Sequence, residues 1–242
     1  MSPRRHAFVS AGLLLATVTG CGTAVTSEDA KPTTPTTTTT PAGRSAAPGG
    51  TPDGIPLAKA VAQLRAAEEA DRDGYDRTRF KHWADADDDA CDTRSEVLID
   101  EAVKAVRQGE DCELTGGKWL SYYDEVTLTE ASGLDIDHMV PLEEAWASGA
   151  TGWTDERREA YANDLGAERS LVAVTARTNR SKGGKDPARW LPPATSAHCT
   201  YAVDWTATKL RWDLAANDKE LTVLNKLVED CPDATVSLKP AA

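Results

Sequence analysis

The stretch that decides the fold is a short run of alternating apolar and polar residues, Leu134-Asp135-Ile136-Asp137-His138-Met139-Val140, which Pro141 ends. This pattern predicts a β-strand, because side chains on a strand alternate between its two faces and proline interrupts regular pairing. A second apolar run, at residues 171–174, predicts another short strand. We expect a helix to open near Asn179 and to stop before Pro192, since proline cannot continue a helix interior.

Asp137 and His138 are adjacent at the end of the first predicted strand, where Pro141 fits a bend. Hydrolysis of a phosphodiester bond needs a base that takes a proton from water and a divalent cation that offsets charge on the phosphate. A histidine with an ordinary pKa of about 6.5 is a suitable base. A carboxylate and an amide oxygen, here those of Asp137 and Asn179, suit a hard cation such as Mg²⁺ that keeps several water ligands.

Asp137-His138-x-Val-Pro, followed by a short hydrophobic strand and Asn179-Arg180-Ser181-Lys182, resembles the HNH endonuclease motif in its Asp-His…Asn form. Further short motifs resemble the secreted HNH-family proteins of bacteria, in the same order: Tyr75-Asp76-Arg77, Cys91-Asp92-Thr93-Arg94, Ala145-Trp146, Ala162-Asn163-Asp164, Pro187 through Trp190-Leu191-Pro192, and Cys199-x-Tyr201. The resemblance therefore covers roughly residues 75–231.

This resemblance implies an α+β fold with a ββα-metal (HNH) core, surrounding helices and one divalent cation. We expect that cation to be Mg²⁺, with Mn²⁺ as the alternative. The resemblance also implies His138 as general base, with Asp137 and Asn179 as metal ligands. We interpret Arg180 and Lys182, on the same predicted helix, as contacts to the substrate phosphate.

One position departs from the HNH pattern. The motif usually has a middle asparagine just before the second strand, where it braces the loop that holds the catalytic histidine. Spacing from Asn179 places Ser170 at this position, and the nearest asparagine, Asn163, lies seven residues earlier. We therefore expect either Asn163 to assist catalysis from a longer loop or Ser170 to brace the loop weakly.

The N-terminus predicts export. Arg4 and Arg5 precede a mostly apolar run at residues 7–18, which is shorter than the roughly 20 residues that span a bilayer. This layout predicts a signal peptide at residues 1–20. The run ends at Val18-Thr19-Gly20-Cys21, which resembles the lipobox of bacterial lipoproteins and implies that Cys21 is lipidated. The expected location is outside the cytoplasm, either anchored by this lipid to the cell membrane or extracellular.

The chain then divides into a linker and a domain. Residues 21–54 are rich in threonine, proline and glycine, with too little apolar surface to offset the entropy of ordering. We expect an extended, disordered linker there. Residues 55–242 are long enough to form one domain with its own core. Within it, the predicted helices are at residues 57–70, 142–148, 156–164, 201–215 and 219–228.

Two further segments of the domain have predictions of their own. Residues 97–109 predict either a strand that runs into a short helix or a single helix ended by Gly109. Residues 113–126 predict two strands joined by a turn at Gly116-Gly117.

Besides Cys21, the sequence contains four cysteines: Cys91, Cys112, Cys199 and Cys231. An even number agrees with disulfide formation after export, and four cysteines allow three connectivities. We favour the local pairs Cys91–Cys112 and Cys199–Cys231 over the alternatives. A four-cysteine zinc site is disfavoured, because zinc sites usually contain closely spaced Cys-x-x-Cys pairs and this sequence has none.

The net charge opposes a nucleic-acid substrate. Removing residues 1–20 takes Arg4 and Arg5 from the 27 basic residues, which leaves 25 against 39 acidic residues, a balance of −14. Nucleic-acid binders are ordinarily basic, because neutralising phosphate supplies much of their affinity. The segment from Arg169 to Trp190 is nevertheless locally basic, with six cationic residues against Asp186 alone. Such a segment can hold a few phosphates, with strong salt dependence.

Two functions therefore remain open at this point. The first is an extracytoplasmic endonuclease that cuts DNA, with RNA as the alternative substrate, and with little sequence preference. The second is a non-catalytic surface lipoprotein, a binding module that uses an HNH-like fold. The first should lose activity with a chelator, whereas the second should not need the ion. The sequence indicates contact with a membrane only through the lipid, and it identifies no protein partner.

Overall fold

The computed structural model describes residues 54–241. The predicted signal peptide, the predicted lipidation of Cys21 and nearly all of the predicted linker lie outside the described residues. The predicted domain at residues 55–242 is described except for its last residue. Within the described part, no helix has both the length and the apolar character needed to cross a membrane.

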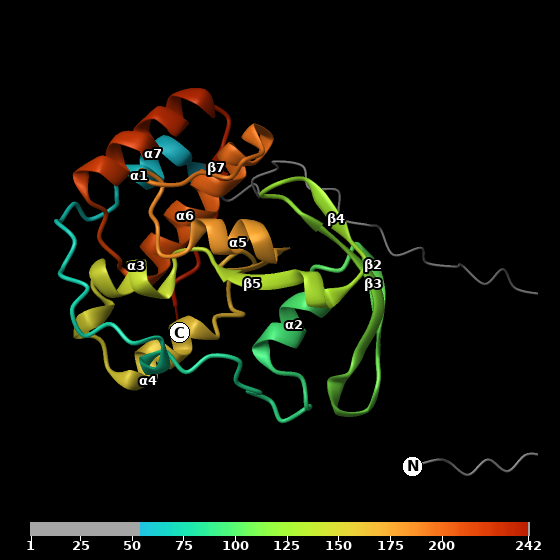
Figure 1. The fold of residues 1–242 in the computed structure, drawn as a ribbon. Helices are drawn as coiled ribbons and strands as arrows, with labels where there is room; N and C mark the ends of the chain where they lie inside the picture. The colour runs from blue at the N-terminus through green and yellow to red at the C-terminus, as the bar shows by residue number, and fades with distance from the viewer. Residues whose placement is uncertain (1–53, 242) are drawn as a thin grey trace, which may run out of the picture. The chain divides into compact units, whose positions relative to one another are not determined.

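Two antiparallel strands and a short helix form the centre of the described part (Figure 1). β5 (Leu134–His138) pairs with β6 (Leu171–Thr175), so that His138 lies opposite Leu171. Every residue of β6 is buried, which explains its continuous apolar sequence. α5 (Ala176–Lys182) follows β6 directly and contacts both strands. The predicted order of strand, strand and helix is confirmed, and so is the α+β class of the fold.

A second sheet, with three antiparallel strands in the order β2–β3–β4, lies beside this centre (Figure 1). It consists of β2 (Lys104–Gln108), β3 (Leu114–Ser121) and β4 (Val126–Leu128), and α2 (Thr93–Asp100) precedes it. The prediction for residues 97–109 is wrong, because the helix comes first and the strand second. The Asp92 side chain accepts a hydrogen bond from the Ser95 amide, and this cap starts the helix earlier than its apolar residues indicated.

The glycine pair predicted as a turn lies inside β3 instead. Gly116 and Gly117 both have positive φ angles, of 70° and 92°. A Cβ atom on Gly117 would lie 2.5 Å from the side chain of Trp119, so this position needs glycine to admit the indole ring. The chain reverses later, between Ser121 and Val126, where β3 gives way to β4.

The other helices pack on the opposite side of β5 from the three-stranded sheet (Figure 1). They are α1 (Leu57–Val61), α3 (Leu142–Ala147), α4 (Asp155–Ala162), α6 (His198–Trp212) and α7 (Asp218–Asp230), and the short strands β1 (Ile55–Pro56) and β7 (Thr235–Val236) pair beside them. Of the six helices predicted for the domain, those at residues 142–148, 156–164, 201–215 and 219–228 are confirmed, with ends shifted by a few residues. The helix expected to open near Asn179 is α5, which begins at Ala176 and ends at Lys182, well before Pro192.

The remaining prediction, a helix at residues 57–70, is wrong in length. α1 ends at Val61, and the chain beyond it runs beside Ala216. The Ala216 amide donates to the Arg65 carbonyl at 2.9 Å, and the Ala67 amide donates to the Ala216 carbonyl at 3.1 Å. These tertiary backbone bonds replace the bonds that a longer helix would have made.

Hydrophobic side chains form two clusters, one on each side of β5. The larger cluster joins α1, α3, α6 and α7. We call the smaller one the second core cluster; it consists of Val97, Leu98, Trp119, Leu134, Ile136, Leu171 and Ala173. Because side chains alternate along β5, Leu134 and Ile136 face this cluster while Asp135 and Asp137 face the other side.

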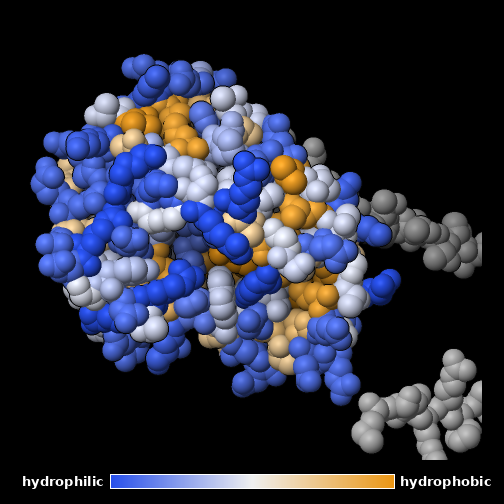
Figure 2. Space-filling model, viewed as in Figure 1, coloured by the Kyte–Doolittle hydropathy of each residue, from blue (hydrophilic) through white to orange (hydrophobic). Residues whose placement is uncertain are grey.

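Most of the surface seen in Figure 2 is hydrophilic, with small separate patches of apolar residues. The large hydrophobic side chains that are exposed come from different elements: Val103, Leu120, Val126, Leu165 and Leu238. Their scatter among loops, strands and the C-terminal segment is ordinary for a globular surface.

Two disulfide bonds close loops of moderate length, with sequence separations of 21 and 32 residues. Cys91, just before α2, pairs with Cys112 in the connection between β2 and β3, and Cys199 at the start of α6 pairs with Cys231 at the end of α7. Both predicted pairs are confirmed. In the chain-entropy model each bond contributes about 3 kcal/mol, because it restricts the unfolded chain.

Candidate active site

A cavity of about 270 Å³ lies where β5 ends, between α5 and the segment that precedes α2. Its walls include four of the predicted site residues, Asp137, His138, Asn179 and Arg180. The residues that the sequence analysis did not assign to the site are Tyr75, Arg77, Ile136, Pro141, Leu142, Glu143, Gly183 and Gly184. The fold therefore brings the predicted base and both predicted metal ligands to one cavity.

His138 is buried, with 5% of its surface exposed, and it is held through one ring nitrogen. Nε2 lies 2.9 Å from the Ala162 carbonyl, which can only accept a hydrogen bond, so Nε2 bears the proton. Nδ1 then has the free lone pair, and within residues 54–241 no hydrogen bond to it is formed. Burial lowers the pKa of His138 to about 3, and the positive charge of Arg77 contributes to this lowering. The imidazole is thus neutral and has one nitrogen able to accept a proton.

Aromatic side chains surround this imidazole. The rings of Trp83 and Tyr161 lie nearly parallel to it, with centroid distances of 5.7 Å and 6.3 Å. A second histidine, His82, lies edge-on with its centroid 6.5 Å away. No site role was predicted for His82 and Trp83, because their contacts with His138 join positions more than fifty residues apart in the chain.

Asp137 is also buried, and one of its oxygens is fully engaged. Oδ2 accepts a hydrogen bond from the Tyr123 hydroxyl at 2.6 Å and forms an ion pair with the Lys182 ammonium. Burial raises the pKa of Asp137 and lowers that of Lys182, and their mutual attraction opposes both effects. Within the described residues, the second oxygen, Oδ1, has no hydrogen-bond partner, and it belongs to a side chain that lines the cavity.

The position of Lys182 corrects a prediction. Its side chain is fully buried, and besides Asp137 its ammonium donates to the backbone carbonyls of His138 at 3.1 Å and Met139 at 2.8 Å. An ammonium group that is withdrawn from solvent and already paired does not reach a substrate phosphate. Lys182 instead holds the turn at the end of β5, and the prediction of a phosphate contact is wrong.

Asn179 is oriented by a neighbour on β5. Its Nδ2 donates to Asp135 Oδ2 at 3.2 Å, and within residues 54–241 its carbonyl oxygen forms no hydrogen bond. The Arg180 guanidinium approaches the same carboxylate at 3.4 Å but keeps 75% of its side chain exposed. Arg180 thus retains the exposure that a phosphate contact requires. Strand alternation, which places Asp135 on the same face as Asp137, could have identified Asp135 from the sequence.

The two candidates for the middle asparagine have different positions. The Ser170 hydroxyl donates to Asp164 at 2.8 Å, and its carbonyl accepts from the Met139 amide at 2.9 Å. Asn163 uses its side-chain amide to hold the segment at residues 81–84, and neither side chain contacts the His138 ring through a hydrogen bond. Asn163 does follow Ala162, the residue whose carbonyl fixes the tautomer of His138.

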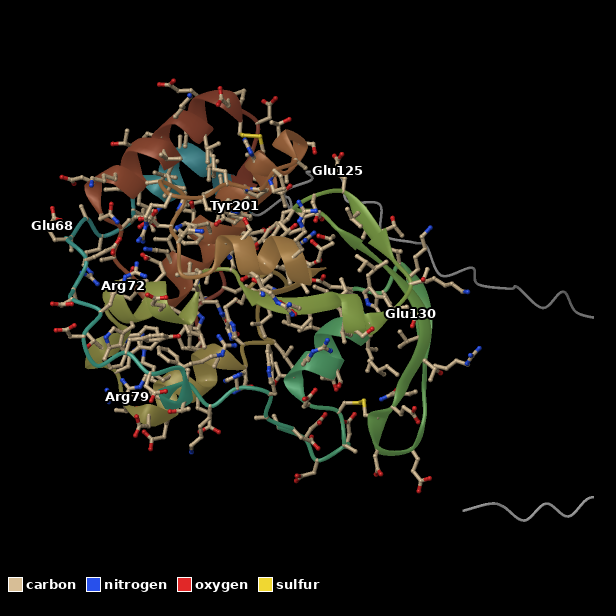
Figure 3. The ribbon with its side chains drawn as sticks, in the orientation of Figure 1. Glu68, Arg72, Arg79, Glu125, Glu130 and Tyr201 are labelled. Atoms are coloured by element: carbon tan, nitrogen blue, oxygen red, sulfur yellow. A yellow bond between two sulfur atoms is a disulfide. The ribbon has the colours of Figure 1, made fainter. Side chains whose placement is uncertain are left out.

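Arg72, labelled in Figure 3, connects the helices on either side of the cavity. One guanidinium nitrogen lies 3.0 Å from both Glu143 Oε1 and the Gly184 carbonyl, and the other donates to Glu144 at 2.8 Å. Glu143 and Glu144 belong to α3, whereas Gly184 follows α5. Arg72 therefore fixes the separation of two cavity walls.

The oxygens of Asp137 and Asn179 are the best candidates for holding a cation. Asp137 Oδ1 and the Asn179 carbonyl oxygen both belong to residues of the cavity wall and have no partner among the described residues. One carboxylate, one amide oxygen and room for water fit a hard cation such as Mg²⁺. A cluster of Glu69, Glu144 and Asp186 is a poorer candidate, because Arg72 and Arg189 already neutralise it.

A larger cavity, of about 480 Å³, lies between α6, the end of β3 and the C-terminal segment. Buried Asp204 and half-buried Arg169 are among its charged groups, and Ser170 also lines it. The predicted base and the predicted metal ligands line only the smaller cavity.

Comparisons with known proteins identify a family and one relative. Residues 92–227 match the family described as "GmrSD restriction endonucleases, C-terminal domain". This range includes Asp137, His138 and Asn179, whereas Arg77 and Trp83 precede it. An "Uncharacterized secreted protein" of Arthroderma benhamiae is 39% identical over 189 residues, which cover 76% of this chain and 91% of that protein. No solved structure matches the chain.

Proposed function

The chain belongs to the family of GmrSD restriction endonuclease C-terminal domains, and on this premise we propose that it is a metal-dependent endonuclease of the HNH type. The observation that carries the proposal is the neutral His138 beside two unengaged oxygen ligands in one cavity. Such a combination supplies the base and the cation site that hydrolysis of a phosphodiester bond requires.

His138 is the general base in this proposal. Its Nδ1 accepts a proton from the attacking water, while the Ala162 carbonyl keeps Nε2 protonated and stabilises the imidazolium that results. The pKa of about 3 makes His138 a weak base in the free protein. A bound phosphate is negatively charged and opposes the cations that contribute to this low pKa, so substrate binding strengthens the base.

Asp137 and Asn179 hold the cation, which we propose to be Mg²⁺, with Mn²⁺ as the alternative. When bound, the ion supplies positive charge that stabilises the phosphate and the leaving oxygen. Lys182 already neutralises the charge of Asp137, and Asn179 is uncharged. The two proposed ligands therefore offer the cation no net negative charge. We therefore expect weak binding of the ion alone and tighter binding when the substrate adds a phosphate oxygen.

Two exposed guanidinium groups replace Lys182 as phosphate contacts. Arg180 lies at the cavity on α5, and Arg77 lies on the opposing segment, where Asp76 caps a 3-10 turn by accepting from the Thr78 amide at 2.8 Å. Guanidinium groups bind phosphate oxygens in pairs of hydrogen bonds. Groups of this kind contact every nucleotide alike, which favours cleavage with little sequence preference, and we propose DNA ahead of RNA as the substrate.

We also propose that the protein acts outside the cytoplasm. The predicted signal peptide and lipobox support export, with either a lipid anchor or release. Two disulfide bonds suit an oxidising compartment, and the relative from Arthroderma benhamiae is described as secreted.

The test is cleavage of supercoiled plasmid DNA by the purified protein with Mg²⁺ or Mn²⁺, with EDTA, and with the variant His138→Ala. Cleavage that needs the ion and falls by about 10²-fold or more in the variant supports the proposal. Intact DNA and RNA after incubation with folded, metal-supplied protein would instead favour a binding module. The balance of −12 over the whole chain is the observation that favours this second function.

A further inference from the structure

The segment at residues 81–84, Lys81-His82-Trp83-Ala84, has an unusual backbone. Trp83 adopts a φ angle of 66°, in the left-handed region that bulky side chains rarely enter. Such conformations persist only where surrounding contacts hold them, and they occur often at functional sites. Two sets of contacts matter at Trp83: those of Asn163 with the backbone around it, and those of the indole with His138.

One side chain, that of Asn163, binds both ends of this segment. Its Oδ1 accepts from the Ala84 amide at 2.9 Å, and its Nδ2 donates to the Lys81 carbonyl at 2.8 Å. The same amide is fixed in turn by the Thr93 hydroxyl at 2.9 Å and the Glu159 carbonyl at 2.8 Å. All the hydrogen-bonding capacity of the Asn163 amide is thus used to join α2, α4 and the 81–84 segment.

The Trp83 indole lies between the core and the candidate base. It packs against the second core cluster and lies nearly parallel to the His138 imidazole, at an angle of 28°. The His82 ring contacts the Trp83 ring edge-on, with a centroid distance of 5.1 Å. Because the second core cluster holds the indole in place, the indole limits rotation of the His138 imidazole that packs on its face.

We propose that Trp83 is a positioning residue for His138, held in its strained conformation by Asn163. This inference rests on the proposed function, because it concerns the orientation of the proposed base. Ala162 holds the imidazole through one hydrogen bond, and Tyr161 lies nearly parallel to the ring at a centroid distance of 6.3 Å. The Trp83 face restricts the ring further and keeps Nδ1 directed at the cavity. The segment lies before the matched family range, which begins at residue 92.

Four variants distinguish a positioning role of Trp83 from ordinary packing. Trp83→Leu removes the aromatic face, whereas Trp83→Phe retains most of it. Asn163→Ala releases the 81–84 segment without touching either ring. The double variant Trp83→Leu/Asn163→Ala tests whether Asn163 acts through Trp83, because two changes on one route are not additive.

In plasmid cleavage with Mg²⁺, we expect Trp83→Leu and Asn163→Ala each to lower kcat by about 10- to 100-fold and to change KM by less than about twofold. Trp83→Phe should recover most of kcat, and the double variant should be no worse than the poorer single variant. The matched control is Asn225→Ala, an exposed asparagine whose side chain bonds only to the Leu221 carbonyl among the described residues. This control should keep kcat.

Nuclear magnetic resonance of the histidine rings in the full chain gives a second readout that needs no cleavage. The His138 ring protons should move downfield in Trp83→Leu, because the ring current of the indole is lost, and move similarly in Asn163→Ala. Unchanged His138 signals and kcat in folded Trp83→Leu would overturn the positioning role, while loss of cleavage in His138→Ala would leave the nuclease proposal intact. If the wild-type protein cuts no nucleic acid, the nuclease proposal fails, and the ring signals still decide whether Asn163 acts through Trp83.

Discussion

Asp135 and Asp137 lie on the same face of β5, two residues apart, but they have different partners. Asp137 is buried and paired with Lys182, whereas Asp135 is half-buried and accepts from Asn179 and Arg180. A carboxylate that binds the NH₂ group of an amide turns the carbonyl oxygen of that amide away from itself. Asp135 is therefore placed to orient the proposed metal ligand Asn179 and not to bind the cation itself.

Replacing Asp135 with alanine should weaken the proposed cation site without removing a ligand. Loss of such an orienting partner typically lowers metal affinity by about 10- to 100-fold. We expect the Mg²⁺ concentration for half-maximal cleavage to rise by this factor in Asp135→Ala. At saturating Mg²⁺, Asp135→Ala should cleave faster than Asn179→Ala, which lacks a proposed ligand. The exposed Asp233→Ala is the matched control. An unchanged Mg²⁺ dependence would contradict the orienting role.

The buried ion pair between Lys182 and Asp137 is a second feature at this scale. Removing one partner of a buried pair leaves an uncompensated charge, which costs about 3–5 kcal/mol. We expect Lys182→Met to lose this much free energy of unfolding in urea. The exposed Lys185→Met should change stability by less than about 0.5 kcal/mol. Adding Asp137→Asn to Lys182→Met should recover part of the loss, and no recovery would show that the cost has another origin.

At the scale of elements, local patterns predicted the strands and helices that depend on local contacts. β5, β6 and four of the predicted helices have apolar patterns that match their burial, and they lie close to the expected residues. The wrong predictions at residues 57–70 and 97–109 have different causes, a tertiary contact in the first segment and a helix cap in the second. The chain after α1 pairs with Ala216, and the Asp92 cap starts α2 early. Apolar periodicity therefore predicts neither the end of α1 nor the start of α2.

The same distinction explains the candidate site. Asp137, His138 and Asn179 were predictable because their order along the chain resembles a known motif. Lys182 was misassigned, because its neighbours in the sequence give no sign that it folds inward to Asp137. Trp83 was missed because it reaches the site from a separate segment, and no local pattern links it to β5. Arg77 belongs to the family-like motif Tyr75-Asp76-Arg77, but no site role was predicted for it.

The glycine pair inside β3 gives a prediction that compares two neighbouring positions. Both glycines have positive φ, but only Gly117 would place a Cβ against Trp119 and Val106, while Gly116 faces open space. We expect Gly117→Ala to destabilise the protein by about 1–3 kcal/mol more than Gly116→Ala, because overpacking is added to backbone strain. Urea denaturation of the two variants checks this. Equal losses would mean that strain alone decides both positions.

At the scale of the whole molecule, the charge near the cavity is less positive than the sequence indicated. Of the cationic residues between Arg169 and Trp190, Lys182 is buried with Asp137, and Arg189 is paired with Asp186 and Glu144. Arg180 stays exposed beside Asp135. In a chain with a net charge of −12, these pairings leave few cations for phosphate, so binding of nucleic acid should be weak and should depend less on salt than the six cationic residues of this segment indicated.

Three carboxylic acids, buried Glu144 and Asp204 and half-buried Glu101, give the domain an unusual dependence on pH. Burial raises the pKa of Glu101, Glu144 and Asp204 to about 7 in each case. The unfolded chain releases these protons near the ordinary values of 3.8 for Asp and 4.5 for Glu. Between those values and about pH 7 the folded protein binds more protons than the unfolded chain. Stability should therefore fall as pH rises through this window.

Asp204 provides the sharpest test. In the described part, Tyr122 is the only side chain that hydrogen-bonds its carboxyl group, at 3.2 Å, and Arg169 and Glu168 are the nearby charges. A folded pKa of about 7 against 3.8 corresponds to at most roughly 4 kcal/mol of lost stability above pH 8. Asp204→Asn keeps an acceptor for Tyr122 and cannot ionise. Urea denaturation should show Asp204→Asn to be more stable than the wild type at pH 8.5, with the difference shrinking at pH 5. If the two proteins differ equally at both pH values, the charge on Asp204 is not the cause, and the amide has changed the packing of α6 instead.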